Sequence, residues 1–417
     1  MKFIKELRKK HAENPKALEF LKFIGPGILV TVGFIDPGNW ATNIEAGASY
    51  GYTLLWVVTL STIMLILLQH NAAHLGIVTG KCLAESATCN VSSKISKPIL
   101  GTAMLATIST AFAELIGAAI ALEILFDIPI KIGAILSFLL VVFFTFSNTY
   151  SRIEKIIISF VSIIGFSFIF EIITINVEWD KTLTHSFMPE IPKGSLLPIL
   201  GVIGAVVMPH NLFLHSEIIQ SRSWNLKGDD VIEKQLKYEF VDTLFSMTIG
   251  WIINSAMIIL AAVVFFNNNI QVTDIAQASE LLTPFLGKFS SIIFAVAFLF
   301  AGISSSITCA ISGGIVFAGM FAESYNIKDL HSKIGVLLSL IPALVIIFFI
   351  DDAFSALVFS QVILCFQLPF TIILQLYLTS SKKVMGKYAN KGFSKIILWS
   401  CAIFVAVLNI ILLFDFF

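Results

Sequence analysis

The chain contains eleven apolar runs that are each long enough to cross a lipid bilayer, and this feature limits its fold more than any other. A spanning helix needs about 20 mostly apolar residues, because its backbone polar groups must be satisfied internally where no water is present. The sequence therefore predicts an all-α integral membrane protein with eleven transmembrane helices. The expected spans are 22–49, 53–77, 98–126, 130–147, 156–177, 197–219, 239–265, 289–321, 334–350, 353–379 and 394–416.

The composition supports this prediction. Of the 417 residues, 57% are hydrophobic and 13% are charged, whereas a soluble domain has about 25% charged residues. Basic and acidic residues balance at 27 each, and a net charge of zero argues against nucleic acid as a partner. The five cysteines form no CxxC pair, which argues against a zinc site or a disulfide framework. We therefore expect the lipid bilayer to cover most of the surface.

Basic residues are distributed unequally between alternate loops. Loops on the N-terminal side of the predicted spans hold 23 lysines and arginines, and the opposite loops hold only Lys131, Lys181, Lys193 and Lys288. In multi-pass proteins the cytoplasmic loops carry the excess of basic residues. The sequence therefore predicts a cell-membrane protein with a cytoplasmic N-terminal segment, 1–21, and an extracellular C-terminus.

The first span is interrupted halfway along its length by Asp36-Pro37-Gly38-Asn39. A carboxylate at the bilayer centre costs about 2.5–3.5 kcal/mol on insertion scales, so it usually marks a function. Proline removes a backbone hydrogen bond and glycine adds backbone freedom, so the helix is expected to break here. The freed carbonyls, the carboxylate and the amide oxygen form a potential cation site. A proline kink with a hydrogen-bonded aspartate is the alternative.

The sixth span is interrupted in the same way by Met208-Pro209-His210-Asn211. This interruption has the corresponding place in the second group of five spans, and the two groups run in opposite directions. Paired broken helices indicate inverted repeats with a binding site at their interface. We therefore expect a 5+5 inverted-repeat, LeuT-like transporter fold. Residues 22–177 would form the first repeat, 197–379 the second, and 394–417 an accessory eleventh helix.

Met208 gives the predicted site its chemical character. A thioether is a poor ligand for Mg²⁺ or Ca²⁺ but is acceptable to Mn²⁺, Fe²⁺, Co²⁺ or Cd²⁺. Beside Asp36 and Asn39, it indicates a site for a first-row divalent metal. His215 lies two helical turns after Met208 on roughly the same face, and an imidazole exchanges protons near neutral pH. His210 and His215 are thus either proton acceptors or buried structural histidines, and spacing alone does not choose between these roles.

These motifs resemble the Nramp family, the natural resistance-associated macrophage proteins, over essentially the whole chain. The resemblance implies the five-plus-five inverted-repeat fold and transport rather than enzymatic activity. It also implies Mn²⁺ as substrate, Fe²⁺ and Cd²⁺ as alternative substrates, H⁺ as co-substrate, no prosthetic group and no obligate protein partner. Beyond the two interruptions, the similar segments are GPG at 25–27, LGIVTGK at 75–81, AELIGAAIAL at 113–122, IINSAMIILAAVVF at 252–265 and SQVILCFQLPF at 360–370.

The resemblance also implies which residues act. His215 resembles the family's histidine on the cytoplasmic side that is tied to proton movement, with His210 close by in sequence. Asp36 resembles the residue that both binds metal and takes part in proton transfer. Gln361 resembles a residue that joins the metal when the site is occluded. The implied metal ligands are therefore the side chains of Asp36, Asn39, Met208 and Gln361 and the backbone carbonyl of Ala205.

The proton path is expected to depart from the family pattern. Glu114 matches the family's glutamate in the third span, but two positions that commonly hold acids there are Ala111 and Met104. The arginines usual at the start of the ninth span are replaced around His331–Lys333. Glu114 is therefore expected either to keep a role in the proton path or to form structural hydrogen bonds. The sequence supports metal binding more directly than tight proton coupling.

Other functions fit the sequence less well. An uncoupled transporter or a Mg²⁺ transporter of the same fold is the nearest alternative, although Mg²⁺ gains nothing from the thioether of Met208. A metal-sensing receptor would need a cytoplasmic output domain, and none is visible outside the spans. An intramembrane enzyme would need a nucleophile with a base or a HExxH zinc motif, and neither is found in the sequence.

Overall fold

The computed structural model describes residues 36–147, 172–173, 175–275 and 288–416. Within these ranges the chain is helical and contains no β-strand. Nine segments of the described part are long and apolar enough to cross a membrane. The first predicted span is described only from Asp36 onward, and most of the fifth lies outside the described residues. The total of eleven therefore stays a prediction.

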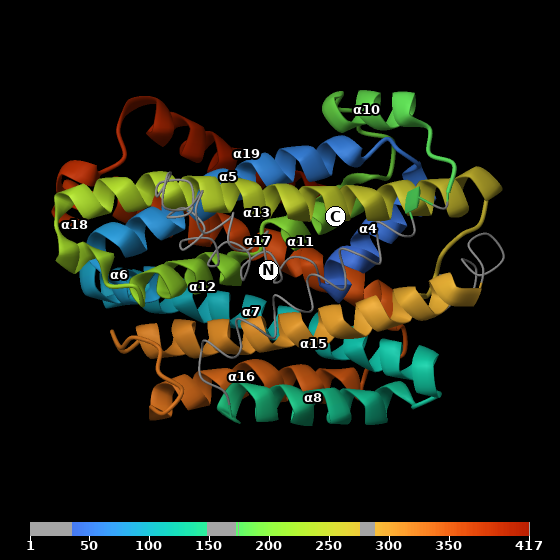
Figure 1. Cartoon of the computed structure of the whole chain (residues 1–417), viewed down its shortest axis with the longest axis horizontal. Helices are drawn as coiled ribbons and strands as arrows, with labels where there is room; N and C mark the ends of the chain where they lie inside the picture. Colours follow the sequence, from blue (N-terminus) through green and yellow to red (C-terminus); the bar gives the residue numbers. More distant parts are fainter. Residues whose placement is uncertain (1–35, 148–171, 174, 276–287, 417) are drawn as a thin grey trace, which may run out of the picture.

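The long helices run along a common axis and pack into a bundle (Figure 1). Apolar side chains both fill the interior and cover the outside, as expected for helices that face lipid. The described helices are, in chain order, α4 (Pro37–Tyr50), α5 (Leu55–Thr79), α6 (Leu83–Asn90), α7 (Ser93–Phe126), α8 (Ile130–Ser147), α10 (Trp179–Phe187), α11 (Leu196–Val206), α12 (Pro209–Gln220), α13 (Asp229–Val264), α15 (Lys288–Gly319), α16 (Leu330–Ile347), α17 (Ala353–Thr379), α18 (Lys382–Met385) and α19 (Gly392–Phe416).

Most of these helices begin and end near the predicted boundaries. The largest differences are at α7, which begins at Ser93 rather than residue 98, and at α13, which begins at Asp229 rather than residue 239. Apolarity reports where lipid covers a helix, whereas its backbone hydrogen bonds continue into polar surroundings. The short helices α6 and α10 have neither the length nor the apolarity of a span, so the sequence does not predict them.

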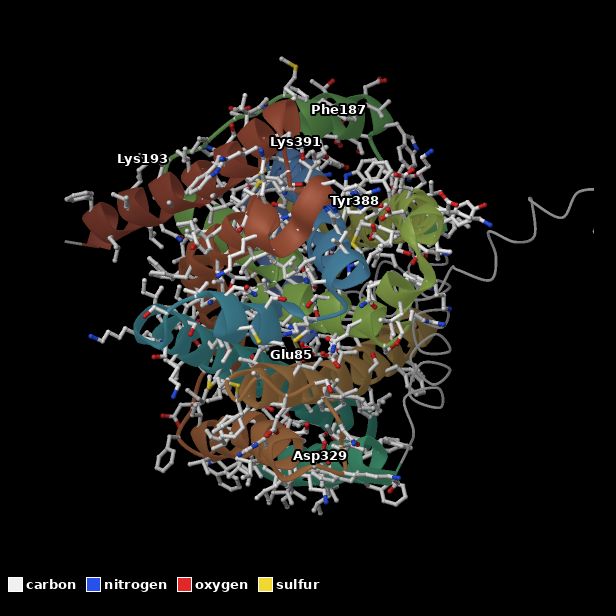
Figure 2. All side chains as sticks on the ribbon, turned by 90° about the vertical axis from the view of Figure 1, so that its left-hand side faces the viewer. Glu85, Phe187, Lys193, Asp329, Tyr388 and Lys391 are labelled. Atoms are coloured by element: carbon white, nitrogen blue, oxygen red, sulfur yellow. The ribbon has the colours of Figure 1, made fainter. Side chains whose placement is uncertain are left out.

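The described loops gather at two opposite ends of the bundle. At one end, Lys387 forms an ion pair with Asp229 at 2.8 Å, and Tyr388 donates a hydrogen bond to the same carboxylate. There too, Thr88 of α6 donates to the carbonyl of Gly319 at the end of α15. We call this the basic end, because it groups the described loops that are predicted to be cytoplasmic. Figure 2 looks onto it, with Glu85 and Tyr388 labelled.

The opposite end holds α10, and we call it the α10 end (Figure 1). Here the indole of Trp56 donates a hydrogen bond to the carbonyl of Glu190 at 2.9 Å. The structure thus places alternate loops at opposite ends, as the predicted order of spans requires. The assignment of the basic end to the cytoplasm rests on the charge bias of the loops.

Two helices begin inside the bundle instead of crossing it. α4 starts at Pro37 and runs toward the α10 end, whereas α12 starts at Pro209 and runs toward the basic end. α7 passes the start of α4 so closely that a Cβ atom on Gly117 would overlap the ring of Pro37. α17 approaches α11 as closely, because a Cβ on Gly204 would overlap the carbonyl oxygen of Gln361. Glycine therefore lets two full-length helices pack directly against the broken ones.

Candidate metal site

The carboxylate of Asp36 caps the N-terminus of α4 at the first break. Its oxygens accept hydrogen bonds from the backbone N–H groups of Gly38 at 3.0 Å and Asn39 at 3.3 Å. Pro37, at the first helical position, has no N–H that needs a partner. These donors and the positive end of the helix dipole stabilise negative charge at this point. The break therefore holds a fully buried carboxylate in the middle of the bundle.

The second break separates α11 from α12, as the sequence predicts. Val207 and Met208 have non-helical backbone angles, and Pro209 starts the next helix. In a continuous helix the carbonyl of Ala205 would accept from the N–H four residues later, but that residue is Pro209, which has none. The same proline thus breaks the helix and frees the Ala205 carbonyl. Met208 is fully buried at the break, and its sulfur accepts a hydrogen bond from Asn211 at 3.7 Å.

Asn39 connects the two breaks. Its side-chain nitrogen Nδ2 donates to the carbonyl of Ala205 at 2.8 Å and to Oδ1 of Asp36 at 2.5 Å. All three residues are completely buried. The structure therefore brings these three predicted residues to one point between the half-helices, and their role as ligands is taken up below as a proposal.

Gln361, on α17, places its side chain beside the break at the start of α4. A Cβ atom on Gly38 would overlap the side-chain amide of Gln361, so this amide stands directly over the first turn of α4. Its nitrogen donates to Ser360 at 3.0 Å. Its oxygen Oε1 is buried and has no hydrogen-bond partner among the described residues. Gln361 thus presents an unused acceptor beside the break, as a residue that completes a cation site would.

Glu114 and His210 are arranged around α7. Glu114 is fully buried, and its carboxyl lies near the carboxyl of Asp36 and the side chain of Ser305 of α15. One helical turn earlier, the hydroxyl of Thr110 lies 3.3 Å from Nδ1 of His210. α7 therefore contacts both of these predicted proton-path residues, and Glu114 lies beside the central carboxylate.

His215 belongs to a different cluster, between α12, α5 and α13. Its Nδ1 lies 3.0 Å from the side-chain oxygen of Gln69, and its Nε2 lies 3.8 Å from the carboxylate of Glu239. His70 of α5 forms a hydrogen bond to the other oxygen of that carboxylate. The sequence does not single out Glu239, because it falls at the predicted boundary of the seventh span, where a charged residue is ordinary. Its burial beside two histidines becomes visible only in the structure.

A cavity of about 610 Å³ opens between α4, the segment after α13 and the start of α17. It lies at the α10 end, and its lining includes two carboxylates, Glu45 and Asp352, together with amide side chains such as Asn269. Glu45 is nine residues after Asp36 on α4, a rise of about 14 Å. The cavity therefore forms an acidic recess above the central site, and acidic recesses concentrate cations.

An all-helical bundle with paired broken helices that meet at a buried polar point is characteristic of membrane transporters with the LeuT-like inverted-repeat fold. The fold is shared with Mhp1, a nucleobase-cation-symport-1 family transporter, whose closed structure superposes with a TM-score of 0.61 at 14% identity, covering 93% of this chain and 91% of that one. The chain belongs to the Nramp family: the sequence model described as natural resistance-associated macrophage protein-like matches residues 27–415. It is a transporter and not an enzyme, as the sequence predicts.

Relatives at moderate identity cover nearly the whole chain. The divalent metal cation transporter MntH of Caldanaerobacter subterraneus subsp. tengcongensis is 37% identical over 400 residues, covering 95% of this chain and 93% of that protein. MntH of Listeria welshimeri is 38% identical over 415 residues, covering 96% and 92%. The crystal structure of the Eremococcus coleocola manganese transporter with an aromatic bis-isothiourea compound superposes with a TM-score of 0.82 at 30% identity, covering 94% and 86%.

Proposed function

We propose that the protein imports divalent transition-metal ions across the cell membrane by alternating access, with Mn²⁺ as the main substrate and Fe²⁺ and Cd²⁺ as alternatives. The observation that carries this proposal is the convergence of Asp36, Asn39 and the Ala205 carbonyl at two facing breaks, next to Met208. The relatives named as divalent metal cation and manganese transporters support it. In this proposal Gln361 joins the ligands when the site is occluded.

The geometry suits a cation that must bind and then leave. The Asp36 carboxylate supplies the only formal charge among the proposed ligands, and the others are neutral donors. The half-helix α11 ends at the site, so the negative end of its dipole also favours a cation. The Ala205 carbonyl, which has no helical N–H partner, adds to this effect. The thioether of Met208 selects against Mg²⁺, which binds oxygen ligands and keeps its water. A site with one negative charge and several neutral oxygen and sulfur ligands favours reversible binding of the metal ion.

Protons are the proposed co-substrate. Glu114 interacts with Asp36 at the break, so a proton and a metal ion compete for the same carboxylate region. His210 contacts Thr110, which lies one turn before Glu114 on α7. His215, Glu239 and His70 form a second cluster. The membrane potential adds about 2.3 kcal/mol per elementary charge per 100 mV, so a divalent ion is driven inward even where proton movement contributes little.

Uptake by purified protein in liposomes tests the metal site. We expect saturable Mn²⁺ and Cd²⁺ uptake, abolished by Asp36→Ala. Met208→Ala should weaken Cd²⁺ uptake at least about tenfold and raise inhibition by Mg²⁺, because the soft ligand is lost. Met257→Ala is the matched control, since Met257 is equally buried but lies on α13, away from the breaks. Equal uptake of Mg²⁺ and Mn²⁺ by the unaltered protein would contradict the proposed selectivity.

Proton coupling is tested in the same liposomes with a pH-sensitive dye inside. We expect internal acidification during Mn²⁺ influx and its reduction in Glu114→Gln. The control is a protonophore, which should abolish the dye signal without stopping metal entry. Mn²⁺ influx with no change of internal pH would support the uncoupled alternative and leave the metal site intact.

A further inference from the structure

Three potential metal ligands meet at the basic end of the bundle, away from the central breaks. Cys82 and Glu85 come from the start of α6, and Glu217 comes from the last turns of α12. The thiol sulfur and one oxygen from each carboxylate all lie within 4.8 Å of one another. Figure 2 shows Glu85 near the middle of this end. We propose that these three residues form a second metal site, which binds a borderline divalent ion such as Zn²⁺, Co²⁺ or Cd²⁺.

The two carboxylates are buried close together, and no basic side chain of the described residues pairs with them. Glu85 is 6% exposed and Glu217 is 9% exposed. In the described part of the chain, no lysine, arginine or histidine forms an ion pair with either one. A buried charge is costly unless an opposite charge or a hydrogen-bond donor compensates it, and two negative charges buried side by side raise that cost. A divalent ion between the carboxylates supplies that partner.

The hydrogen bonds around the cluster leave one ligand position unused. Oε2 of Glu85 accepts from the backbone N–H of Cys82 at 3.0 Å, and Oε1 of Glu217 accepts from the backbone N–H of Tyr325 at 3.2 Å. These bonds orient both carboxylates. Oε2 of Glu217 is buried, and no N–H or O–H group of the described residues donates to it; the side chain that interacts with Glu217 there is the thiol of Cys82. A buried acceptor without such a donor, beside a thiol and a second carboxylate, is the arrangement that a metal ion would satisfy.

The donor set indicates the class of ion. One sulfur and two carboxylate oxygens match Zn²⁺-type ions, which bind cysteine at about 2.3 Å and carboxylate at about 2.1 Å. At the tetrahedral angle, the ligand atoms around such an ion are about 3.4–3.6 Å apart. The three ligand atoms already lie within 4.8 Å of one another, so small side-chain rotations are enough. Mn²⁺ stands lowest in the affinity order of first-row divalent metals and prefers oxygen. The second site should therefore bind Co²⁺, Zn²⁺ and Cd²⁺ more tightly than Mn²⁺.

The cluster joins α6 to α12, the half-helix that begins at the second break. Glu217 lies nine residues after Met208 on α12, and Glu45 lies nine residues after Asp36 on α4, so each half-helix carries a glutamate at the same distance from its break. Ser216, next to Glu217, accepts a hydrogen bond from the backbone N–H of Leu83 at the start of α6. An ion held by α6 and α12 together would strengthen this contact at the basic end.

Cobalt absorption tests the proposal without any assay of transport. A cobalt–thiolate bond gives a charge-transfer band in the near ultraviolet, and carboxylate, amide or thioether ligands do not give that thiolate band. We expect the purified full-length protein to show the band on titration with Co²⁺. Cys82→Ser should abolish it while keeping the helix capped, since serine is a favoured N-cap residue. Glu217→Gln should weaken Co²⁺ binding at least tenfold.

Two controls separate this site from the rest of the chain. Cys89 lies on α6 but outside the cluster, so Cys89→Ser should leave the band unchanged. Met208→Ala should also keep the band, because none of the proposed ligands of the central site is a thiol. This variant separates failure of the second site from failure of the proposed transport site. A wild-type protein without the band, or a band that survives in Cys82→Ser, would overturn the proposal and indicate that protons alone compensate the two carboxylates.

Discussion

The side-chain nitrogen of Asn39 donates a hydrogen bond to the backbone carbonyl of Ala205 at 2.8 Å, across 166 positions of the chain. This bond joins the start of α4 to the end of α11, and so it connects the two inverted repeats at their breaks. The carbonyl is available because Pro209 cannot donate to it. Pro209 of the second half thus leaves a carbonyl without a helical partner, and Asn39 of the first half donates to it.

We expect Asn39→Ala to reduce metal binding more than it reduces folding stability. The change removes a proposed ligand and the bond between the breaks. A hydrogen bond of this kind contributes about 0.5–1.5 kcal/mol to stability. In unaltered protein, Mn²⁺ at about 100 times its dissociation constant should stabilise the fold by about 2.7 kcal/mol. Thermal unfolding of purified protein with and without Mn²⁺ should show that this metal-dependent shift is lost in the variant.

Asn43→Ala is the matched control for Asn39. Asn43 lies one turn further along α4 and donates to Asn254 of α13 at 3.0 Å, so it is also a buried amide in a contact between helices. Its loss should lower the unfolding temperature while the increase caused by Mn²⁺ is retained. If both variants keep the full Mn²⁺ shift, Asn39 is not a ligand.

Gly38 and Gln361 should behave as a coupled pair. A methyl group at residue 38 would occupy the place of the Gln361 amide, which is the end of a flexible side chain and can be displaced. We expect Gly38→Ala to weaken Mn²⁺ binding about tenfold and the double variant with Gln361→Ala to recover part of the loss. Binding titrations on the four proteins give the coupling energy, which for residues in contact is about 0.5–3 kcal/mol. Strictly additive effects would show that a methyl group at residue 38 does not contact the side chain of Gln361.

Both breaks could be predicted from sequence because their cause is local. Pro37 and Pro209 each lack an N–H group and interrupt an apolar run, and Asp36 is conspicuous in a chain with few charges. The contact of Asn39 with Ala205 could not be derived in this way. It depends on how two distant half-helices face each other, and only the family resemblance indicated it.

The cluster of Cys82, Glu85 and Glu217 shows what the sequence leaves open. Glu217 lies inside the predicted sixth span, so the criterion that selected Asp36 applies to it as well. Cys82 and Glu85 gave no such signal, because they precede and enter a short helix in a loop. Whether a loop helix packs on a half-helix is a tertiary contact, and no local pattern reports it.

Gly117 should tolerate no side chain, whereas Gly101 on the same helix should. A Cβ atom at residue 117 would overlap the ring of Pro37, which is rigid, but at residue 101 it would meet nothing within 4 Å. Gly117→Ala should therefore destabilise the protein by about 1–3 kcal/mol, as overpacking does. Gly101→Ala should be neutral or stabilise by up to about 1 kcal/mol, because alanine favours a helix interior. Thermal unfolding checks both, and equal stability of the two variants would contradict the close packing of α7 on the first break.

The cap of α17 should be sensitive to pH at Asp352. Hydrogen bonds from Ser355 hold the pKa of the Asp352 carboxyl below its usual range, and the backbone N–H of Ser355 donates to it at 3.0 Å. A lowered folded pKa means that the stabilisation is present above the unfolded value of about 3.9 and is lost as pH falls through the folded value. Asp352→Ala should destabilise the cap by about 1 kcal/mol at neutral pH, whereas Asp352→Asn should keep the cap and remove its dependence on acid. Amide hydrogen exchange over residues 353–357, corrected for intrinsic rates, measures the stability of the first turn of α17 in each variant and at each pH. Protection equal to that of the wild type in Asp352→Ala would refute the capping role.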